Sequence, residues 1–302
     1  MANIVSIEPK SVSVAQFHSY MLSTIAPRPI AFVSTIDQQG QVNLSPFSFF
    51  NVFGSNPPIL IFSPARRVRD NTDKHSLENV KEVGEVVVNI VNYAIVEQTS
   101  LASTEYPKGV NEFIKAGLTP VPSVKVAPPR VLESPAAYEC KVIQIIETGH
   151  EGGAGNLVVC EVVLAHFQPH IFDEDGKINP QKIDLVARMG YDFYCRASGE
   201  AVFEVPKPNV NKGMGIDQIP VYIRESHILT GNHLGRLGNS QQFPAQEEVE
   251  AYAQSEEIKR LLGQLDATSE AFYEALHQQA KVLIEANEIQ KAWLTLLQWR
   301  KK

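Results

Sequence analysis

Short polar side chains and a run of cations gather within residues 27–74, close to where the sequence pattern predicts strands to end. The polar side chains are Ser34, Thr35, Asn43, Ser45, Ser48, Asn51 and Ser63, and the basic loop that follows contains Arg66, Arg67, Arg69, Thr72 and Lys74. Amides and hydroxyls suit the edge of a flat heteroaromatic ring, whereas Arg, Lys and the N–H groups at a helix start suit a phosphate. The set therefore fits a heteroaromatic ligand with a phosphorylated tail. The alternative is a group of ordinary strand ends beside a solvated arginine loop.

Three strands must position these side chains, over residues 29–36, 41–46 and 59–62. The first is rich in β-branched and aromatic residues, and it leads into a turn in which Gly40 is free to take a positive φ. In the second, Asn43 and Ser45 alternate with apolar residues and so share one face. Pro46 lacks a backbone donor, so the pattern predicts that residues 46–51 leave the sheet.

A resemblance to the flavin reductase-like family is carried by PRPIAFVST, GQVNLSPFSFFN and PPILIFS, and continues through RVRDNTDKHSLENV and EVVVNIVN. The family has an FMN-binding split β-barrel. The resemblance implies a mainly β fold with peripheral helices over residues 1–205. A C-terminal extension, rich in loops and then helical, is expected over residues 206–302.

The resemblance also implies roles for individual residues. The flavin ring and ribityl chain would be held by Ser34, Thr35, Asn43, Ser45, Pro46, Phe47, Ser48, Phe49 and Phe50. The phosphate would be held by Ser63, Arg69, Thr72 and Lys74. Many relatives have Lys-Asp-Thr in the phosphate loop, whereas this chain reads RDNTDK, so the cation that meets the phosphate stays open.

A second stretch, residues 183–194, resembles the element that closes the same barrel near the flavin. It offers Arg188 and Gly190 followed by Tyr191 and Tyr194. The alternative is that Arg188 pairs with a surface carboxylate and that the tyrosines pack the end of the barrel.

The function implied is that of an NAD(P)H-dependent flavin reductase, in which FMN accepts hydride at ring N5 from NADH or NADPH. Such chemistry needs no acid–base dyad, so no catalytic residue is assigned. The resemblance further implies a homodimer with the flavin near its interface. The alternatives are an FMN-binding electron carrier or flavin sensor without nicotinamide turnover, and a β-barrel without ligand.

Composition narrows the partners and the compartment. The net charge of −7 and the pI near 5.7 disfavour nucleic acid and anionic lipid. No apolar run approaches the ~20 residues that span a bilayer, and no secretory signal is recognised at the N-terminus. Cys140, Cys160 and Cys195 are far apart and odd in number, which favours reduced thiols and a cytoplasmic protein.

Three other motifs are weak. Gly153 and Gly155 lie between two strands close in sequence, so no dinucleotide-binding βαβ unit can form. His166 and His170, with Asp173 beyond, have metal-like spacing but lie at a strand end, and the interpretation as ordinary histidines is favoured. No metal site is therefore expected, and no GxSxG elbow or activated cysteine is present.

Local patterns predict the remaining elements. Helical segments are expected over residues 72–83, 93–103 and 111–116, strands over 85–91, 138–147 and 157–168, and a proline-rich extended segment over 118–135. Asp70, Asn71 and Thr72 are the candidate N-caps of the first helix.

The C-terminal third differs in kind. Residues 213–238 are predicted to form a glycine-rich loop, in which a second anion-binding loop is the minority interpretation. Helical periodicity starts at Gln246 and is expected to stop at Gly263. Residues 267–302 lack Gly and Pro and predict one helix about 50 Å long. Its apolar stripe could be covered by the barrel or by a partner chain.

Overall fold

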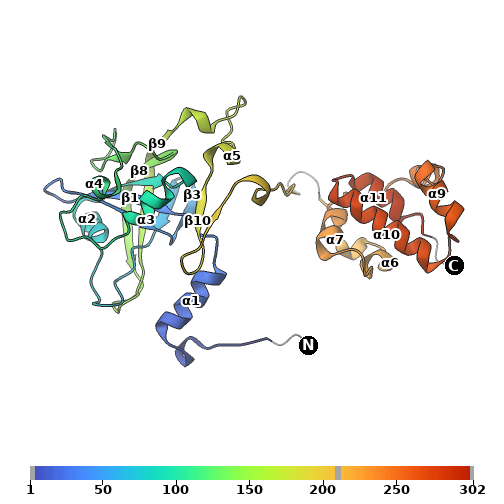
Figure 1. Cartoon of the computed structure of the whole chain (residues 1–302), viewed down its shortest axis with the longest axis horizontal. Helices are drawn as coiled ribbons and strands as arrows, with labels where there is room; N and C mark the ends of the chain where they lie inside the picture. The colour runs from blue at the N-terminus through green and yellow to red at the C-terminus, as the bar shows by residue number, and fades with distance from the viewer. Residues whose placement is uncertain (1–3, 208–211, 300–302) are drawn as a thin grey trace. The chain divides into compact units, whose positions relative to one another are not determined.

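The computed structural model describes residues 4–207 and 212–299. The chain divides into two compact units, Met1–Phe203 and Glu204–Lys302. The first contains all the strands of the described chain, whereas the elements of the second, from α6 onward, are helices (Figure 1).

The first unit is built on one antiparallel seven-stranded sheet in the order β2-β1-β5-β8-β9-β4-β3. Its strands are β1 (Ala31–Ile36), β2 (Val42–Phe47), β3 (Phe50–Ser55), β4 (Pro58–Phe62), β5 (Glu85–Ile90), β8 (Ala136–Glu147) and β9 (Asn156–Phe167). The two edge strands, β2 and β3, are consecutive in the sequence. The expected long hairpin is confirmed as β8–β9.

The sheet curls until strands far apart in its order share one core. The rings of Phe47 on β2 and Phe62 on β4 lie 5.4 Å apart, although four strands separate β2 from β4 in the sheet. Val33, Val88 and Cys160 belong to the same buried cluster. The fold is therefore an open barrel whose inner face is apolar.

Short helices cover the two faces of the β1–β2 end of the sheet. Helix α2 (His75–Val83) adds Leu77 and Val80 to the core inside the barrel. Helices α3 (Val96–Leu101) and α4 (Glu112–Ala116) contact β2, and a second apolar cluster on that side contains Phe32, Leu44 and Phe113.

The other elements of this unit are smaller. They are η1 (Pro9–Ser11), α1 (Val14–Thr24), η2 (Tyr93–Ile95), β6 (Pro120–Val121), β7 (Arg130–Val131), η3 (Pro169–Ile171), α5 (Pro180–Ile183), β10 (Val186–Arg188), β11 (Tyr194–Arg196) and η4 (Gly199–Ala201). Strands β6 and β7 pair within the proline-rich segment, and β10 and β11 form a hairpin.

The prediction that residues 46–51 leave the sheet is wrong. Strand β2 continues through Pro46 to Phe47, and β3 begins at Phe50. The backbone N–H of Leu44 donates to Glu112 Oε2 at 2.9 Å, so it points away from β1. Pro46, two residues farther on, points the same way, and its missing N–H therefore costs no hydrogen bond of the ladder.

The start of α2 also differs from the prediction. The helix begins at His75 with Lys74 as its N-cap residue, and no side chain caps it. Asp70 instead accepts hydrogen bonds from the N–H and hydroxyl of Thr72, at 3.1 and 2.6 Å. This local turn competes with the helix for the same backbone.

The second unit contains η5 (Ile216–Gln218), α6 (Val221–Arg224), α7 (Gly231–Gly238), α8 (Gln246–Tyr252), α9 (Glu256–Gln264), α10 (Glu270–Glu285) and α11 (Ile289–Leu296). The glycine-rich stretch is thus partly helical, because Thr230 and His233 form a capping box at the start of α7. Helix α9 passes Gly263 and ends one residue later.

The single helix expected over residues 267–302 is two helices, α10 and α11. The chain turns at Asn287, whose φ of +64° is the left-handed conformation that glycine usually supplies. The apolar stripe is covered within its own unit: Ile284 and Trp293 pack in one cluster with Ile223 and Leu237. Neither the barrel nor a partner chain is required to bury it.

Within residues 4–207 and 212–299, no helix combines the length and apolar character needed to cross a bilayer.

Candidate functional site

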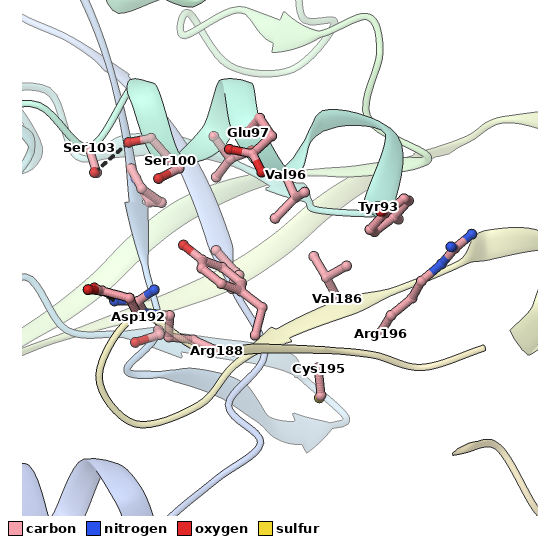
Figure 2. A pocket seen from close by; sticks show the side chains of 15 residues that line it. Tyr93, Val96, Glu97, Ser100, Ser103, Val186, Arg188, Asp192, Cys195 and Arg196 are labelled. Atoms are coloured by element: carbon pink, nitrogen blue, oxygen red, sulfur yellow. Dashed lines mark hydrogen bonds and ion pairs between the residues drawn. The ribbon is translucent and has the colours of Figure 1, made fainter. Parts of the chain in front are cut away.

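A cleft of about 620 Å³ lies beside the end of β2, near several of the sequence-predicted residues. Figure 2 shows Tyr93, Val96, Glu97, Ser100 and Ser103 on one side, facing the β10–β11 hairpin that carries Val186, Arg188, Cys195 and Arg196. Pro46 and Ser48 add the end of the edge strand. A volume of this size is typical of sites for small organic ligands.

Two arginine–aromatic pairs line the cleft. The guanidinium of Arg188 lies 4.6 Å from the ring centroid of Tyr194, and that of Arg196 lies 3.9 Å from the ring of Tyr93. Arg196 also binds Asp184 at 2.7 and 2.8 Å, and these hydrogen bonds raise the pKa of its guanidinium. The cleft therefore offers flat aromatic surface together with guanidinium groups, which suits a planar ligand with polar edges.

Arg188 is held in place by the buried Arg28. The two residues exchange backbone hydrogen bonds of 2.9 Å in both directions. The Arg28 guanidinium donates to the carbonyls of Leu22 and Met189, the latter at 2.8 Å, and to Ser48 Oγ at 3.3 Å. Burial, and then the charge of Arg188, lower the pKa of Arg28. Arg28 thus joins the end of α1, the β10–β11 hairpin and the β2–β3 connection at one side of the cleft.

A smaller polar pocket of about 30 Å³ lies next to the cleft, and both are lined by Ser103. Asn43, Ser45, Arg67 and Lys74 are among its lining residues. Within the described residues the Lys74 ammonium forms no ion pair, and it lies 5.4 Å from the ring centroid of Phe47. Burial, and then the charge of Arg67, lower the pKa of Lys74, although Glu105 opposes the shift. An ammonium that makes no ion pair among the described residues is available to hydrogen-bond an anionic ligand.

Comparisons with known proteins identify the family. Residues 22–181 match the model described as the flavin reductase like domain. An uncharacterized protein of Aquifex aeolicus is 37% identical over 188 residues, which is 62% of this chain and 93% of that protein. The chain belongs to the flavin reductase-like family.

Solved structures agree with this assignment. The nitrilotriacetate monooxygenase component B from Bacillus cereus has a TM-score of 0.63 and 28% identity, covering 68% of this chain and 100% of that one. A candidate flavin reductase with a split barrel domain from Shewanella frigidimarina has a TM-score of 0.56 and 28% identity, covering 66% and 95%. The expected fold, a split β-barrel followed by a helical extension, is confirmed, and the class of protein is a flavin-related oxidoreductase.

The structure places the residues that the flavin reductase-like resemblance implied in five locations. Pro46, Ser48 and Arg188 line the cleft, and Asn43, Ser45 and Lys74 line the polar pocket. Phe49, Phe50 and Ser63, again with Ser48, line a separate groove of about 600 Å³ beside β3. Ser34, Thr35 and Phe47 are buried, and Arg69 and Thr72 lie on the loop before α2.

Two of the buried residues already have hydrogen-bond partners inside the protein. Ser34 donates to the carbonyl of Pro129, and Thr35 accepts from Asn79 Nδ2 at 3.0 Å. Ser63 Oγ likewise accepts the backbone N–H of Asn156 at 3.1 Å. In this flavin reductase-like chain, these three hydroxyls hold elements of the barrel together.

The exposure of the basic side chains indicates which cation can meet the phosphate. The Arg69 side chain is 76% exposed and pairs with Glu105 at 3.1 Å, and it does not line the polar pocket. Arg67, whose side chain is 16% exposed, does line it together with Lys74. Lys74 and Arg67 are therefore better placed than Arg69 to meet a bound anion.

The sequence did not predict the cleft residues that lie far from β2 along the chain. These residues are Tyr93 on η2, Ser100 on α3, Ser103 just after α3 and Arg196 on β11, about 50 to 150 residues after β2. Their types are ordinary for a helix and a short strand, so no local signal marks them.

The weak motifs are explained by ordinary structural roles. His166 Nε2 lies 2.7 Å from an oxygen of the buried Glu139, which also accepts the backbone N–H groups of Val124 and Lys125. No cluster of three metal-binding side chains occurs among the residues that the structure describes. Cys140 and Cys160 are buried, and burial raises the pKa of the Cys160 thiol to about 12, so these thiols are unreactive.

Substituting Ser45 tests whether the polar pocket binds the ligand. Ser45 is half-buried on the edge strand β2, and we expect Ser45→Trp to weaken FMN binding at least 10-fold by filling the pocket. The measurement is the FMN dissociation constant, with thermal melting as the control for folding. An unchanged constant in a stably folded variant would remove Ser45 from the site.

Proposed function

We propose that this chain is an NAD(P)H-dependent flavin reductase that binds FMN. The observation that carries the proposal is the meeting, at Ser103, of an aromatic-lined cleft of about 620 Å³ with a polar pocket that contains Lys74. A flavin ring fits the chemistry of the first, and its single phosphate fits the charge of the second. The residues that would hold FMN are Pro46, Ser48, Ser103 and Arg188 at the ring, and Asn43, Ser45, Arg67 and Lys74 at the ribityl chain and phosphate.

The chemistry that bound FMN would supply is acceptance of a hydride from NADH or NADPH at ring N5. The chain's part is to bind and orient. Hydroxyls of Ser48, Ser100 and Ser103 offer hydrogen bonds to polar edges, and Tyr93 and Tyr194 offer apolar surface. No side chain is required to carry a proton in the hydride step, so we assign no catalytic residue.

Two measurements on the purified full-length chain test this function. A titration followed by flavin fluorescence measures FMN binding, and the loss of NADH or NADPH absorbance in air measures turnover, with FMN alone and protein alone as controls. We expect binding together with nicotinamide oxidation that requires both protein and FMN. Bound FMN without oxidation would instead identify an electron carrier or flavin sensor, and no binding would contradict the proposal.

The homodimer implied by the family resemblance is part of the proposal. It is supported by the edge strand β3, where Val52 and Phe53 are both 64% exposed beside the groove of about 600 Å³. Exposed apolar side chains on a sheet edge offer a surface on which another chain can pair and pack. We expect the double variant Val52→Lys, Phe53→Glu to shift the chain from dimer to monomer in light scattering after gel filtration. A variant that remains dimeric would place the interface elsewhere, and a monomeric wild type would contradict the dimer.

A cytoplasmic location also belongs to the proposal. It is supported by the free Cys140, Cys160 and Cys195, which form no disulfide. Fractionation of cells that express the chain would test it, since recovery in an oxidising compartment would contradict it.

A further inference from the structure

A carboxylate lies where the flavin phosphate is proposed to bind. Glu105 lines the same polar pocket as Lys74. One of its oxygens is 3.4 Å from Arg67 Nε, and the other is 3.1 Å from Arg69 Nη2. Its side chain is 49% exposed. Glu105 therefore neutralises part of the positive charge that a phosphate would use.

The other titratable groups that line the pocket add little charge to it, so the opposing negative charge comes from Glu105. Burial, before any other influence, lowers the pKa of His75, so His75 is neutral near pH 7. Glu112 is buried and accepts the N–H of Leu44, and burial raises its pKa. Lys74 and Arg67 are thus the cations of the pocket, and Glu105 is its partly exposed carboxylate among the described lining residues.

Glu105 is not needed to hold Arg67 in place. Arg67 Nη1 donates to Thr72 Oγ1 at 3.0 Å and to the carbonyl of Asp73. These contacts fix the guanidinium from within the loop before α2. Removing the charge of Glu105 should therefore keep the Arg67 guanidinium in place but remove its counterion.

We propose that Glu105 is a competing anion that weakens phosphate binding and keeps the flavin exchangeable. This inference rests on the proposed function, and it concerns whether the flavin is a permanently held cofactor or a substrate that is released. A phosphate that enters the pocket meets Glu105 at short range in a partly desolvated setting, where charges interact more strongly than in bulk water. Glu105 thereby sets the affinity for flavins that carry a phosphate, and it does not affect the ring.

Glu105→Gln tests the proposal because it removes the charge and keeps the shape. We expect the dissociation constant for FMN to fall about 10-fold, whereas that for riboflavin, which lacks the phosphate, changes less than 2-fold. The gain for FMN should shrink as salt is raised, since salt screens partly exposed charges. Glu288→Gln is the matched control, because Glu288 is a half-exposed carboxylate with one lysine partner, Lys291, at 2.6 Å.

The two ligands separate the possible failures. FMN binding that weakens or stays unchanged in Glu105→Gln, with normal thermal melting, would show that Glu105 supports the pocket or has no part in it. An equal gain for FMN and riboflavin would also overturn the proposal, because the charge would then act on the ring or the fold. If the wild type binds neither ligand, the proposed function itself fails.

Discussion

Lys74→Met should weaken FMN binding about 30-fold and leave riboflavin binding within about 2-fold. Methionine keeps the length of the side chain and its packing beside Phe47, but it removes the ammonium. Hydrogen bonds to charged groups contribute roughly 1.5–3 kcal/mol, which corresponds to a factor of about 10 to 140 in the dissociation constant. Lys74 belongs near the middle of this range, because it is half-buried and has no ion-pair partner among the described residues, but shares its pocket with Glu105.

Two variants accompany this measurement by fluorescence titration. Lys141→Met removes an exposed lysine of β8 and controls for net charge, with no change in FMN affinity expected. Arg69→Ala tests the residue that the family resemblance implied, and its exposure predicts a loss of less than about 3-fold. A larger loss for Arg69→Ala than for Lys74→Met would show that the phosphate binds at the outer part of the loop and not in the polar pocket.

The barrel could be predicted from the sequence where local patterns are strong. The β8–β9 hairpin and the segments over β1, β4 and β5 are rich in β-branched residues and bounded by turn residues, and each was predicted within a few residues of its observed bounds. The error at Pro46 has a tertiary cause. A proline ends pairing only when its backbone faces a neighbouring strand, and at an edge strand it faces outward.

The wrong predictions for the C-terminal unit arise because Asn and Gly each occur in more than one structural role. The positive φ of Asn287 ends α10, so a stretch without glycine or proline contains two helices. Conversely, Gly238 lies at the end of a helix, where an added Cβ would come within 3.1 Å of the backbone of Gly215. Glycine is needed there for a close approach between segments, which a sequence pattern does not distinguish from a flexible loop.

At the candidate site, closeness in the sequence was also a poor guide to closeness in the fold. The sequence grouped hydroxyls and cations by their closeness along the chain, but alternation in the strands and the curl of the sheet send them to different places. Asn43 and Ser45 reach the polar pocket, whereas Ser34 and Thr35 are fully buried against partners of their own. The side chains that close the cleft come from residues 93–103 and from β11, and their distance from β2 in the sequence exceeds the range of any local pattern.

A buried histidine gives the C-terminal unit a pH dependence that can be measured. His277 is fully buried on α10, and its Nδ1 lies 2.7 Å from Ser226 Oγ. Ser226 Oγ accepts the N–H groups of Ile228 and Leu229, both at 3.2 Å, so its own proton is free to donate to Nδ1. The neutral imidazole then carries its proton on Nε2, which is buried and has no partner within the described residues. The structure therefore accommodates the neutral ring and disfavours the charged one.

We expect this unit to lose about 2.5 kcal/mol of unfolding free energy between pH 7 and pH 4.5. Burial, and then the charge of His227, lower the pKa of His277 from 6.5 to about 4. Because the unfolded chain takes up the proton first, the stabilisation is complete above pH 6.5 and is lost as the pH falls toward 4. The loss is about 1.4 kcal/mol per pH unit over this range.

Tryptophan fluorescence isolates the effect, because both tryptophans of the chain, Trp293 and Trp299, belong to the C-terminal unit. Urea melts followed by this signal at several pH values should show the loss in the wild type. In His277→Leu the loss should nearly vanish, since Ser226 keeps its two backbone donors and no buried group remains to be protonated at this position. An equal pH dependence in the two proteins would assign the effect to other groups, and a flat wild-type profile would show that His277 is protonated without cost.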